Sequence, residues 1–324
     1  MIKRTIEISQ QPMHLTARNG QLLLLRKDEP ATRLPANPPN LAASIPCEDI
    51  GVVMVEHSGT TFSHAALSTL LANDAALVIC GRDHLPCGMI LPIADHSEIV
   101  HRLHQQIEIK KPLRKQLWKQ IVQEKIRAQA ANLPQGSSVR SHLLALARNV
   151  RSGDPSNVEA QAARAYWRVW LERDEGDINT RDFRRDPAGD PPNNLLNYGY
   201  AIMRAAVARA IVSAGLNPAL GIHHSHRANA FCLADDLMEP LRPIVDDQAR
   251  ELFNSGCEEL TPPTKAALLE LLTVRVRTGD TKGPLMVGLH RLVASLVRCY
   301  EGVEKRLIIP VACVDEEEHT ASGD

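Results

Sequence analysis

The 324-residue sequence has no long apolar run. Its first ten residues, MIKRTIEISQ, lack the apolar core of about 7–15 residues that marks a signal peptide. No later stretch approaches the roughly 18 consecutive apolar residues of a membrane-spanning helix. We therefore expect a soluble cytoplasmic protein that does not contact a membrane.

Cysteine is scarce and irregularly placed. The seven cysteines, at positions 47, 80, 87, 232, 257, 299 and 313, form an odd and scattered set. Cys80 and Cys87 are too far apart for a zinc knuckle. The cysteines are therefore expected to be free thiols.

Glycine-rich phosphate loops and internal repeats are also missing. Neither a GxxxxGK[ST] segment nor a GxGxxG segment after a strand occurs, so nothing supports a nucleotide held by a glycine loop. A hydrophobic fraction of 44% with 23% charged residues is typical of a soluble globular protein. The length favours two domains.

Residues 1–97 carry short runs of strand-forming residues. The runs are TIEIS, QLLLLR, IGVVMVE and ALVICG. Asn19-Gly20 and the segment LPANPPN predict turns between strands. The segment SHAALSTLLAND has apolar residues three and four apart and predicts one short helix. We expect a β-rich domain over residues 1–97.

From residue 98 to 314 the apolar periodicity is helical. It runs through 99–133 and through 195–215, where Gly215 predicts a helix end. The fold class is therefore predicted as α+β, with an N-terminal β-rich domain followed by a larger all-α domain. Residues 315–324 hold five acids and no Lys or Arg, and predict a disordered acidic tail.

A net charge of −1 hides a basic segment in the middle of the chain. Residues 101–151 contain eleven Lys or Arg against two Glu, a local charge of +9. Such a block is either a solvated helix face or a surface that binds a polyanion such as DNA. The candidate contacts within it are Lys110, Lys111, Arg114 and Lys115.

An acidic cluster lies in the segment LADDLMEPLRP, where Asp235, Asp236 and Glu239 fall within five positions. Carboxylates near an imidazole such as His224 can bind a divalent metal. The alternative is structural, because Asp235 or Asp236 could cap a helix. Glu239 follows these aspartates at helical spacing, so the three carboxylates would repel one another without a cation.

A third candidate carboxylate lies near the start of another predicted helix. Asp154 is placed as the N-cap and Pro155 as the first helical residue, which puts Glu159 about one turn in. Taken alone, Glu159 would be an ordinary surface glutamate. A mixed Glu and His set suits Mg²⁺ or Mn²⁺.

Histidine offers several candidates. His223, His224 and His226, with Cys232 nearby, would suggest structural zinc, but a second pair of cysteines is missing.

Several motifs together resemble one known family. They are an Asn-x-Glu-Ala helix start at 157–160, LNYGY at 196–200, Gly-Ile-His-His at 221–224 and DLMEPLRP at 236–243, with residues 46–92 in the first domain. This combination is similar to the CRISPR-associated endonuclease and integrase family Cas1. The compact length and the LMEPLRP segment look most like its type II branch.

The resemblance implies a β-rich dimerisation domain before a helical catalytic domain. It also implies a divalent metal, Mg²⁺ or Mn²⁺, held by Glu159, His224 and Glu239, with Asp236 in the outer shell. Arg164, Arg168 and Arg204 would add contacts to the DNA backbone. The implied reaction joins the 3′-OH ends of short double-stranded DNA fragments to the repeat array by transesterification.

The resemblance further implies a homodimer that assembles with the small protein Cas2 into a hetero-hexamer, with the RNA-guided effector nuclease as a further candidate partner. Two alternatives stay open. One is a metal-dependent nuclease that cleaves branched DNA without integration. The other is a non-catalytic DNA-binding scaffold, in which the acidic cluster would only cap a helix.

Overall fold

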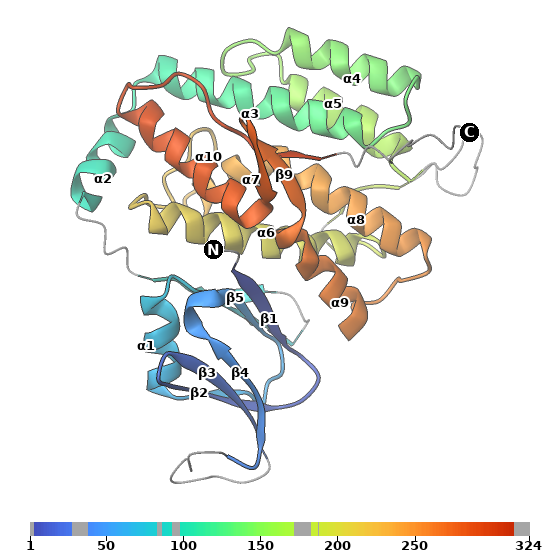
Figure 1. Ribbon diagram of the computed structural model, residues 1–324. Coiled ribbons are helices and arrows are strands. Elements are labelled where there is room, and N and C mark those ends of the chain that lie inside the picture. Colours follow the sequence, from blue (N-terminus) through green and yellow to red (C-terminus); the bar gives the residue numbers. More distant parts are fainter. Residues whose placement is uncertain are drawn as a thin grey trace, which may run out of the picture.

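The computed structural model describes residues 3–27, 38–82, 86–92, 98–171, 183–186 and 188–313. The predicted domain boundary at residue 97, part of the LPANPPN segment and the acidic tail 315–324 lie outside these ranges. Figure 1 shows a strand-rich part, built from the beginning of the chain, beside a larger helical part. The mixed α and β fold is thus confirmed.

The strand-rich part contains two four-stranded sheets. The first has the order β1 (Arg4–Ile8), β5 (Ile50–Val55), β7 (Ala76–Cys80), β8 (Pro86–Ile90). The second has the order β4 (Leu41–Pro46), β3 (Gln21–Arg26), β2 (Met13–Arg18), β6 (Thr61–Phe62). Helix α1 (His64–Ala72) lies against β2. All four predicted runs form strands, and Asn19 and Gly20, both at positive φ, form the predicted turn between β2 and β3.

Strand β5 explains how the two parts join. All six of its residues are buried, as expected for a strand covered on both faces. Val53 and Val55 pack into the core of the strand-rich part, while Val52 and Met54 face the core of the helical part. Because side chains alternate along a strand, one apolar strand contributes to two cores.

The helical part contains most of the chain. Its helices are α2 (Ile99–Glu108), α3 (Lys111–Ala131), α4 (Ser138–Asn149), α5 (Val158–Val169), α6 (Asn193–Ser213), α7 (Cys232–Met238), α8 (Arg242–Asn254), α9 (Pro262–Leu269) and α10 (Leu285–Tyr300), with short 3₁₀ turns such as η3 (Glu239–Leu241) and η4 (Glu270–Thr273). Helix α6 runs through the middle and contacts β5, β7 and β8 (Figure 1). Fifteen of its 21 residues are buried. Gly215, at φ +71°, follows its end as predicted.

Two details of the helical prediction are wrong. The continuous pattern from residue 99 is two helices, because the chain turns at Ile109 and Lys110 just before Pro112. The part after residue 97 is also not all-α. A three-stranded antiparallel sheet forms there from β9 (Arg275–Thr278), β10 (Thr281–Pro284) and β11 (Val311–Ala312). These strands have two to four residues, too few to establish a clear alternation in the sequence.

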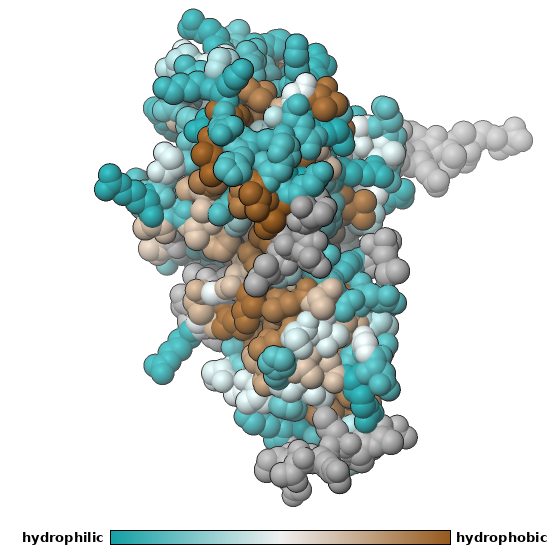
Figure 2. All heavy atoms as spheres, turned by 90° about the vertical axis from the view of Figure 1, so that its left-hand side faces the viewer, coloured by the Kyte–Doolittle hydropathy of each residue, from teal (hydrophilic) through white to brown (hydrophobic). Residues whose placement is uncertain are grey.

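Two buried cations of the helical part, Lys265 and Arg209, bind groups of the strand-rich part. The Lys265 Nζ lies 2.5 Å from the Glu56 Oε1, and both side chains are almost fully buried. Arg209 on α6 donates a hydrogen bond to the carbonyl oxygen of Asp74. The face shown in Figure 2 carries apolar surface along this junction. All seven cysteines are free, as predicted. In the described ranges no helix combines the length and apolar character needed to cross a bilayer.

Gly199 allows α6 and α8 to approach closely. A Cβ at this position would lie 2.4 Å from the Val245 Cγ1. Replacing a helical glycine by alanine usually stabilises a helix by about 1 kcal/mol. Here we expect Gly199→Ala to destabilise the protein by about 1–3 kcal/mol, because the added methyl overpacks the interface. Urea denaturation checks this value.

The double variant Gly199→Ala/Val245→Ala provides the control. Removing the Val245 methyl groups opens space for the new methyl, so the double variant is expected to lose less stability than the sum of the two single changes. Strictly additive losses would contradict the close contact.

Candidate metal centre

Glu159 is positioned by the turn that precedes α5. The Asp154 carboxylate accepts hydrogen bonds from the backbone N–H groups of Val158, at 2.9 Å, and Glu159, at 3.0 Å. Asp154 therefore satisfies two donors of the helix start, but it is not the N-cap that was predicted, because the N-cap is Asn157. The helix itself begins at Val158, with Asn157 in the left-handed region before it. The placement of Pro155 as first helical residue is thus wrong, and Glu159 lies in the first turn.

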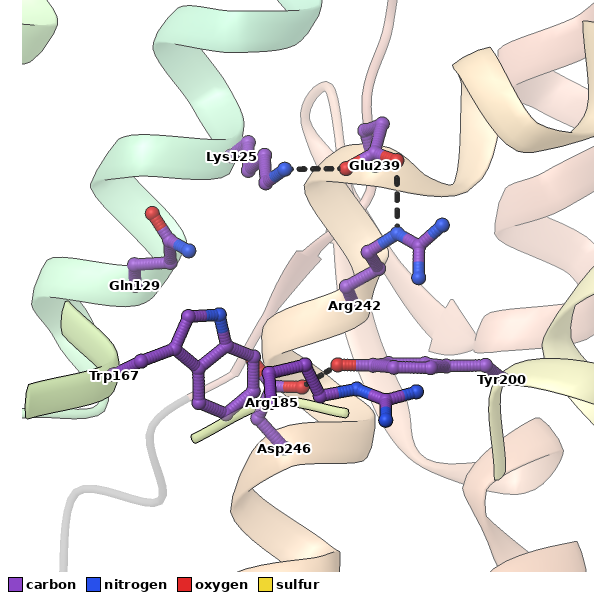
Figure 3. Close-up of a pocket in the computed structure, with 8 residues that line it drawn as sticks. All are labelled: Lys125, Gln129, Trp167, Arg185, Tyr200, Glu239, Arg242 and Asp246. Atoms are coloured by element: carbon purple, nitrogen blue, oxygen red, sulfur yellow. Dashed lines mark hydrogen bonds and ion pairs between the residues drawn. The ribbon is translucent and has the colours of Figure 1, made fainter. Parts of the chain in front are cut away.

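Glu239 begins the short turn η3, directly after α7. Its side chain is only 8% exposed and lies between two cations. The Lys125 Nζ is 2.5 Å from one carboxylate oxygen, and the Arg242 Nε is 2.9 Å from the other (Figure 3). Burial alone would raise the pKa of Glu239, but the charges of Lys125 and Arg242 outweigh it and lower the pKa to about 2.

Lys125 joins the two glutamates. Its Nζ lies 2.5 Å from the Glu159 Oε1 as well as 2.5 Å from the Glu239 Oε2, so carboxylates from two separate segments converge on one positive charge. Burial would lower the pKa of Lys125, but the two carboxylates raise it above its usual value. The ammonium group is held in its charged form.

Sequence reasoning missed Lys125 as a member of the site. The signal was present, because Lys125 stands among Ile121, Val122, Ile126 and Gln129 on the buried stripe of α3. A buried lysine requires a partner of opposite charge. The net charge of +9 for residues 101–151 included Lys125 together with the exposed cations.

His224 is oriented by Asp236. The Nδ1 atom lies 2.5 Å from the Asp236 Oδ1, and the backbone N–H of His223 donates to the Oδ2 at 2.8 Å. Because an ionised carboxylate only accepts hydrogen bonds, Nδ1 carries the proton and Nε2 is left for a ligand. This hydrogen bond is the largest cause of the raised pKa of His224, and the charges of Glu239 and Glu159 add to it.

The other histidines of this corner have different contacts. His223 stacks on Trp118, with ring centroids 4.2 Å apart and planes 4° apart. The Nδ1 of His226 accepts the backbone N–H of Ala228. Gly221 is required at the corner, since a Cβ there would lie 2.3 Å from the carbonyl oxygen of His224.

The acidic cluster does not act as a helix cap. The first residue before α7 is Phe231, and no side chain caps this helix. Asp235 instead accepts hydrogen bonds from Arg204 and Asn229, both at 2.7 Å. Asp235, Asp236 and Glu239 thus face separate partners, which relieves the repulsion expected from their spacing.

The three proposed ligands are only partly assembled. Within the described ranges, no three His, Cys, Asp or Glu side chains form a ready metal-binding group. Glu159 and Glu239 meet at Lys125, and His224 is close enough for both charges to raise its pKa. Carboxylate and imidazole are donor types that a hard divalent ion accepts, and Lys125 occupies the place where the two carboxylates converge.

The predicted DNA contacts lie on three helices. Lys110, Lys111 and Lys115 are exposed at the start of α3, and Arg114 is half-buried. Arg164 and Arg168 are exposed on α5. Arg204 on α6 is 43% exposed but forms an ion pair with Asp235, so part of its charge is already neutralised.

Comparison with known proteins decides the family. The family model described as CRISPR associated protein Cas1 matches residues 6–261. The chain belongs to this family. It is 37% identical over 256 residues to a CRISPR-associated endonuclease Cas1 of Neisseria meningitidis serogroup C (strain 8013), covering 78% of this chain and 81% of that protein.

Solved structures share the fold. A casposase bound to integration product has a TM-score of 0.75 at 20% identity, covering 94% of this chain and 93% of the casposase chain. A Cas6-RT-Cas1–Cas2 complex contains a chain with a TM-score of 0.71 at 18% identity, covering 96% of this chain and 36% of the larger one. The arrangement of strand-rich and helical parts is thus a Cas1 fold.

Asp246 lies deeper in this Cas1 chain, below Glu239 (Figure 3). It is 1% exposed and accepts a hydrogen bond from the Tyr200 hydroxyl. Burial raises the pKa of Asp246 to about 7, against the effects of Tyr200 and Arg242. The folded protein therefore holds this proton more tightly than the unfolded chain between about pH 4 and pH 7.

The free energy of unfolding should consequently fall as pH rises through this window, by at most about 1.4 kcal/mol per pH unit from Asp246. We expect Asp246→Asn to gain stability relative to wild type between pH 5 and pH 8, measured by urea denaturation at each pH. Asp247→Asn, at a side chain 44% exposed, is the matched control and should follow the wild type. Parallel curves for Asp246→Asn and wild type would contradict the raised pKa.

Proposed function

We propose that this Cas1 chain is a divalent-metal-dependent DNA integrase and endonuclease. It would join the 3′-OH ends of short double-stranded DNA fragments to a CRISPR repeat array by transesterification. The observation that carries the proposal is the convergence of Glu159 and Glu239 on one buried positive charge. The shared fold with a casposase solved with an integration product supports the integrase reading.

Glu159, Glu239 and the Nε2 of His224 would hold the metal, Mg²⁺ or Mn²⁺. When bound, such an ion supplies activation of a hydroxyl and neutralisation of the charge that develops on the phosphate and the leaving oxygen. One neutral imidazole beside two carboxylates limits the negative charge that an incoming DNA phosphate meets.

The residues around these ligands keep them in place. Asp236, which is fully buried, fixes the tautomer and direction of the half-exposed His224 ring. Arg242 holds one oxygen of Glu239 and leaves the other facing Lys125. The exposed basic residues of α3 and α5 would contact the DNA backbone, so we expect DNA affinity to fall steeply with salt.

We also propose that the chain forms a homodimer through its strand-rich part and assembles with Cas2 into a hetero-hexamer. The fold similarity to chains of a Cas6-RT-Cas1–Cas2 complex supports the Cas2 partnership. Helix α2 supports further contacts, because Val100 and Ile107 are 64% and 63% exposed. The type II assignment and contact with the effector nuclease rest on the sequence motifs alone and stay predictions.

The two alternatives make different predictions. A scaffold that only binds DNA has no use for two carboxylates that converge on one buried cation. A branched-DNA nuclease could use the same ligands but would transfer the phosphate to water. Incubation with Cas2, Mn²⁺, a duplex with 3′-OH ends and a supercoiled repeat plasmid separates them, since only an integrase joins the fragment covalently to the plasmid.

Substitution of the ligands tests the metal centre. Because Glu239 is buried between two cations, alanine would leave Arg242 without its carboxylate partner and Lys125 with Glu159 alone, so Glu159→Gln, His224→Ala and Glu239→Gln are the suitable variants. Each is expected to lose strand joining by at least about 100-fold while the melting temperature stays within a few degrees. Asp236→Asn should lose about 10–100-fold through its effect on His224.

Asp235→Asn is the matched control, because Asp235 belongs to the same acidic cluster but faces Arg204 and Asn229. It should join DNA within a fewfold of the wild type. Near wild-type joining by a folded Glu239→Gln variant would refute the assignment of Glu239 as a ligand.

Lys125 gives a prediction of opposite sign. If its ammonium group occupies the place of the metal, it competes with the metal for Glu159 and Glu239. We expect Lys125→Met to bind Mn²⁺ several-fold more tightly in calorimetry and to melt at a lower temperature in EDTA, because the two carboxylates then repel each other. Lys119→Met, on the same helix, should change neither quantity, and weaker Mn²⁺ binding by Lys125→Met would count against competition.

A further inference from the structure

A pocket of about 140 Å³ lies beside the candidate metal centre. It opens next to Lys125 and Glu239 and extends toward α6 and α8 (Figure 3). Its remaining lining residues are Gln129, Trp167, Arg185, Tyr200, Arg242 and Asp246. An engineered cavity of about 150 Å³ holds one benzene. A group the size of a phosphate therefore fits this pocket.

Arg185 is the unusual member of this lining. Its two terminal nitrogens donate to the side-chain oxygens of Asn193, at 2.9 Å, and Asn197, at 2.5 Å. Its guanidinium also lies over the Tyr200 ring, 5.3 Å from the centroid. Both of these hydrogen-bond partners are neutral amides. Its position is thus fixed by neutral groups, and among the described residues no carboxylate lies within ion-pair distance of it.

Neighbouring cations differ from Arg185 in this respect. Arg242 pairs with Glu239, and Lys125 pairs with both Glu239 and Glu159. Burial lowers the pKa of Arg185, so keeping its charge in this place costs free energy. A guanidinium that is partly buried at a cost in free energy, and whose hydrogen-bond partners are neutral, is typical of a site that binds an anion.

The other groups of the pocket leave this positive charge in excess. Asp246 also lines the pocket, and it accepts a hydrogen bond from Tyr200. Burial raises the pKa of Asp246 to about 7, so Asp246 is not fully ionised near neutral pH. A guanidinium has five N–H donors, of which Asn193 and Asn197 take two. Tyr200 is a further hydrogen-bond partner of Arg185, so among the described residues at most two N–H groups are left for a ligand.

We propose that Arg185 anchors a phosphate-binding subsite that takes one backbone phosphate of the DNA strand whose 3′ end lies at the metal centre. The inference rests on the proposed function for the identity of the ligand. A planar guanidinium binds two phosphate oxygens at once, which fixes the register of the strand as well as its affinity. The subsite would thereby set how far the 3′ end reaches toward Glu159 and Glu239.

The test is a set of duplexes that each carry one neutral methylphosphonate at a different position near the 3′ end. Affinity is measured with Ca²⁺ in place of Mg²⁺, so that binding is separated from chemistry. In the wild type, one position should weaken binding by about 5–30-fold, the effect of losing a charge-assisted pair. Arg185→Gln should bind the unmodified duplex about 5–30-fold more weakly than the wild type does. A methylphosphonate at the sensitive position should not weaken binding by Arg185→Gln any further.

Arg184→Gln is the matched control, because Arg184 is exposed in the same segment and does not line the pocket. Like the wild type, Arg184→Gln should bind the duplex with a methylphosphonate at the sensitive position about 5–30-fold more weakly than the unmodified duplex. Arg185→Lys keeps the charge without the fork and should recover part of the effect, which guards against a folding defect in Arg185→Gln. If the effects of Arg185→Gln and of the methylphosphonate on affinity add at every position, with the variant folded, the subsite is wrong.

Failure of the subsite and failure of the proposed function are distinguishable. Strand joining by the wild type together with additive losses means that the subsite is wrong and the integrase assignment stands. A position-specific coupling to Arg185 supports the subsite as a DNA phosphate site whether or not strand joining is observed.

Discussion

The repulsion between Glu159 and Glu239 is the constraint on which this part of the molecule depends. Two carboxylates that converge in a partly buried place cannot both stay ionised without a positive charge between them. The protein supplies that charge from Lys125, 2.5 Å from each. In the folded chain Lys125 therefore balances the charge of both carboxylates, and Arg242 further keeps Glu239 ionised.

The surrounding architecture holds these charges in register. Lys125 is one of the buried residues of the 21-residue helix α3, which places its ammonium group beside both carboxylates. The same helix supplies Trp118, which stacks on His223 and so fixes the corner that carries His224. Helix α6 packs behind this assembly and against the first sheet, so the strand-rich part supports the centre indirectly.

Sequence alone indicated much of this arrangement. The β-type runs of the first 97 residues predicted the strands, and the helical periodicity of α6 predicted that helix. Each pattern is long enough to show its period. The strands β9 to β11 were missed because they are short. Asp154 was predicted as the N-cap, but the N-cap is Asn157, and a left-handed asparagine leaves no periodic signal. The roles of Lys125 and Arg185 depend on contacts between residues 34 and 12 positions apart, which no local pattern contains.

The central claim is that Glu159 and Glu239 form a site for a divalent cation in which Lys125 is the substitute. Anomalous diffraction from crystals grown with Mn²⁺ tests it most directly. The account predicts one manganese peak between the two carboxylates, with the His224 Nε2 as a ligand and the Lys125 ammonium displaced from its present position. Full manganese occupancy elsewhere, with Lys125 still bridging Glu159 and Glu239, would contradict it.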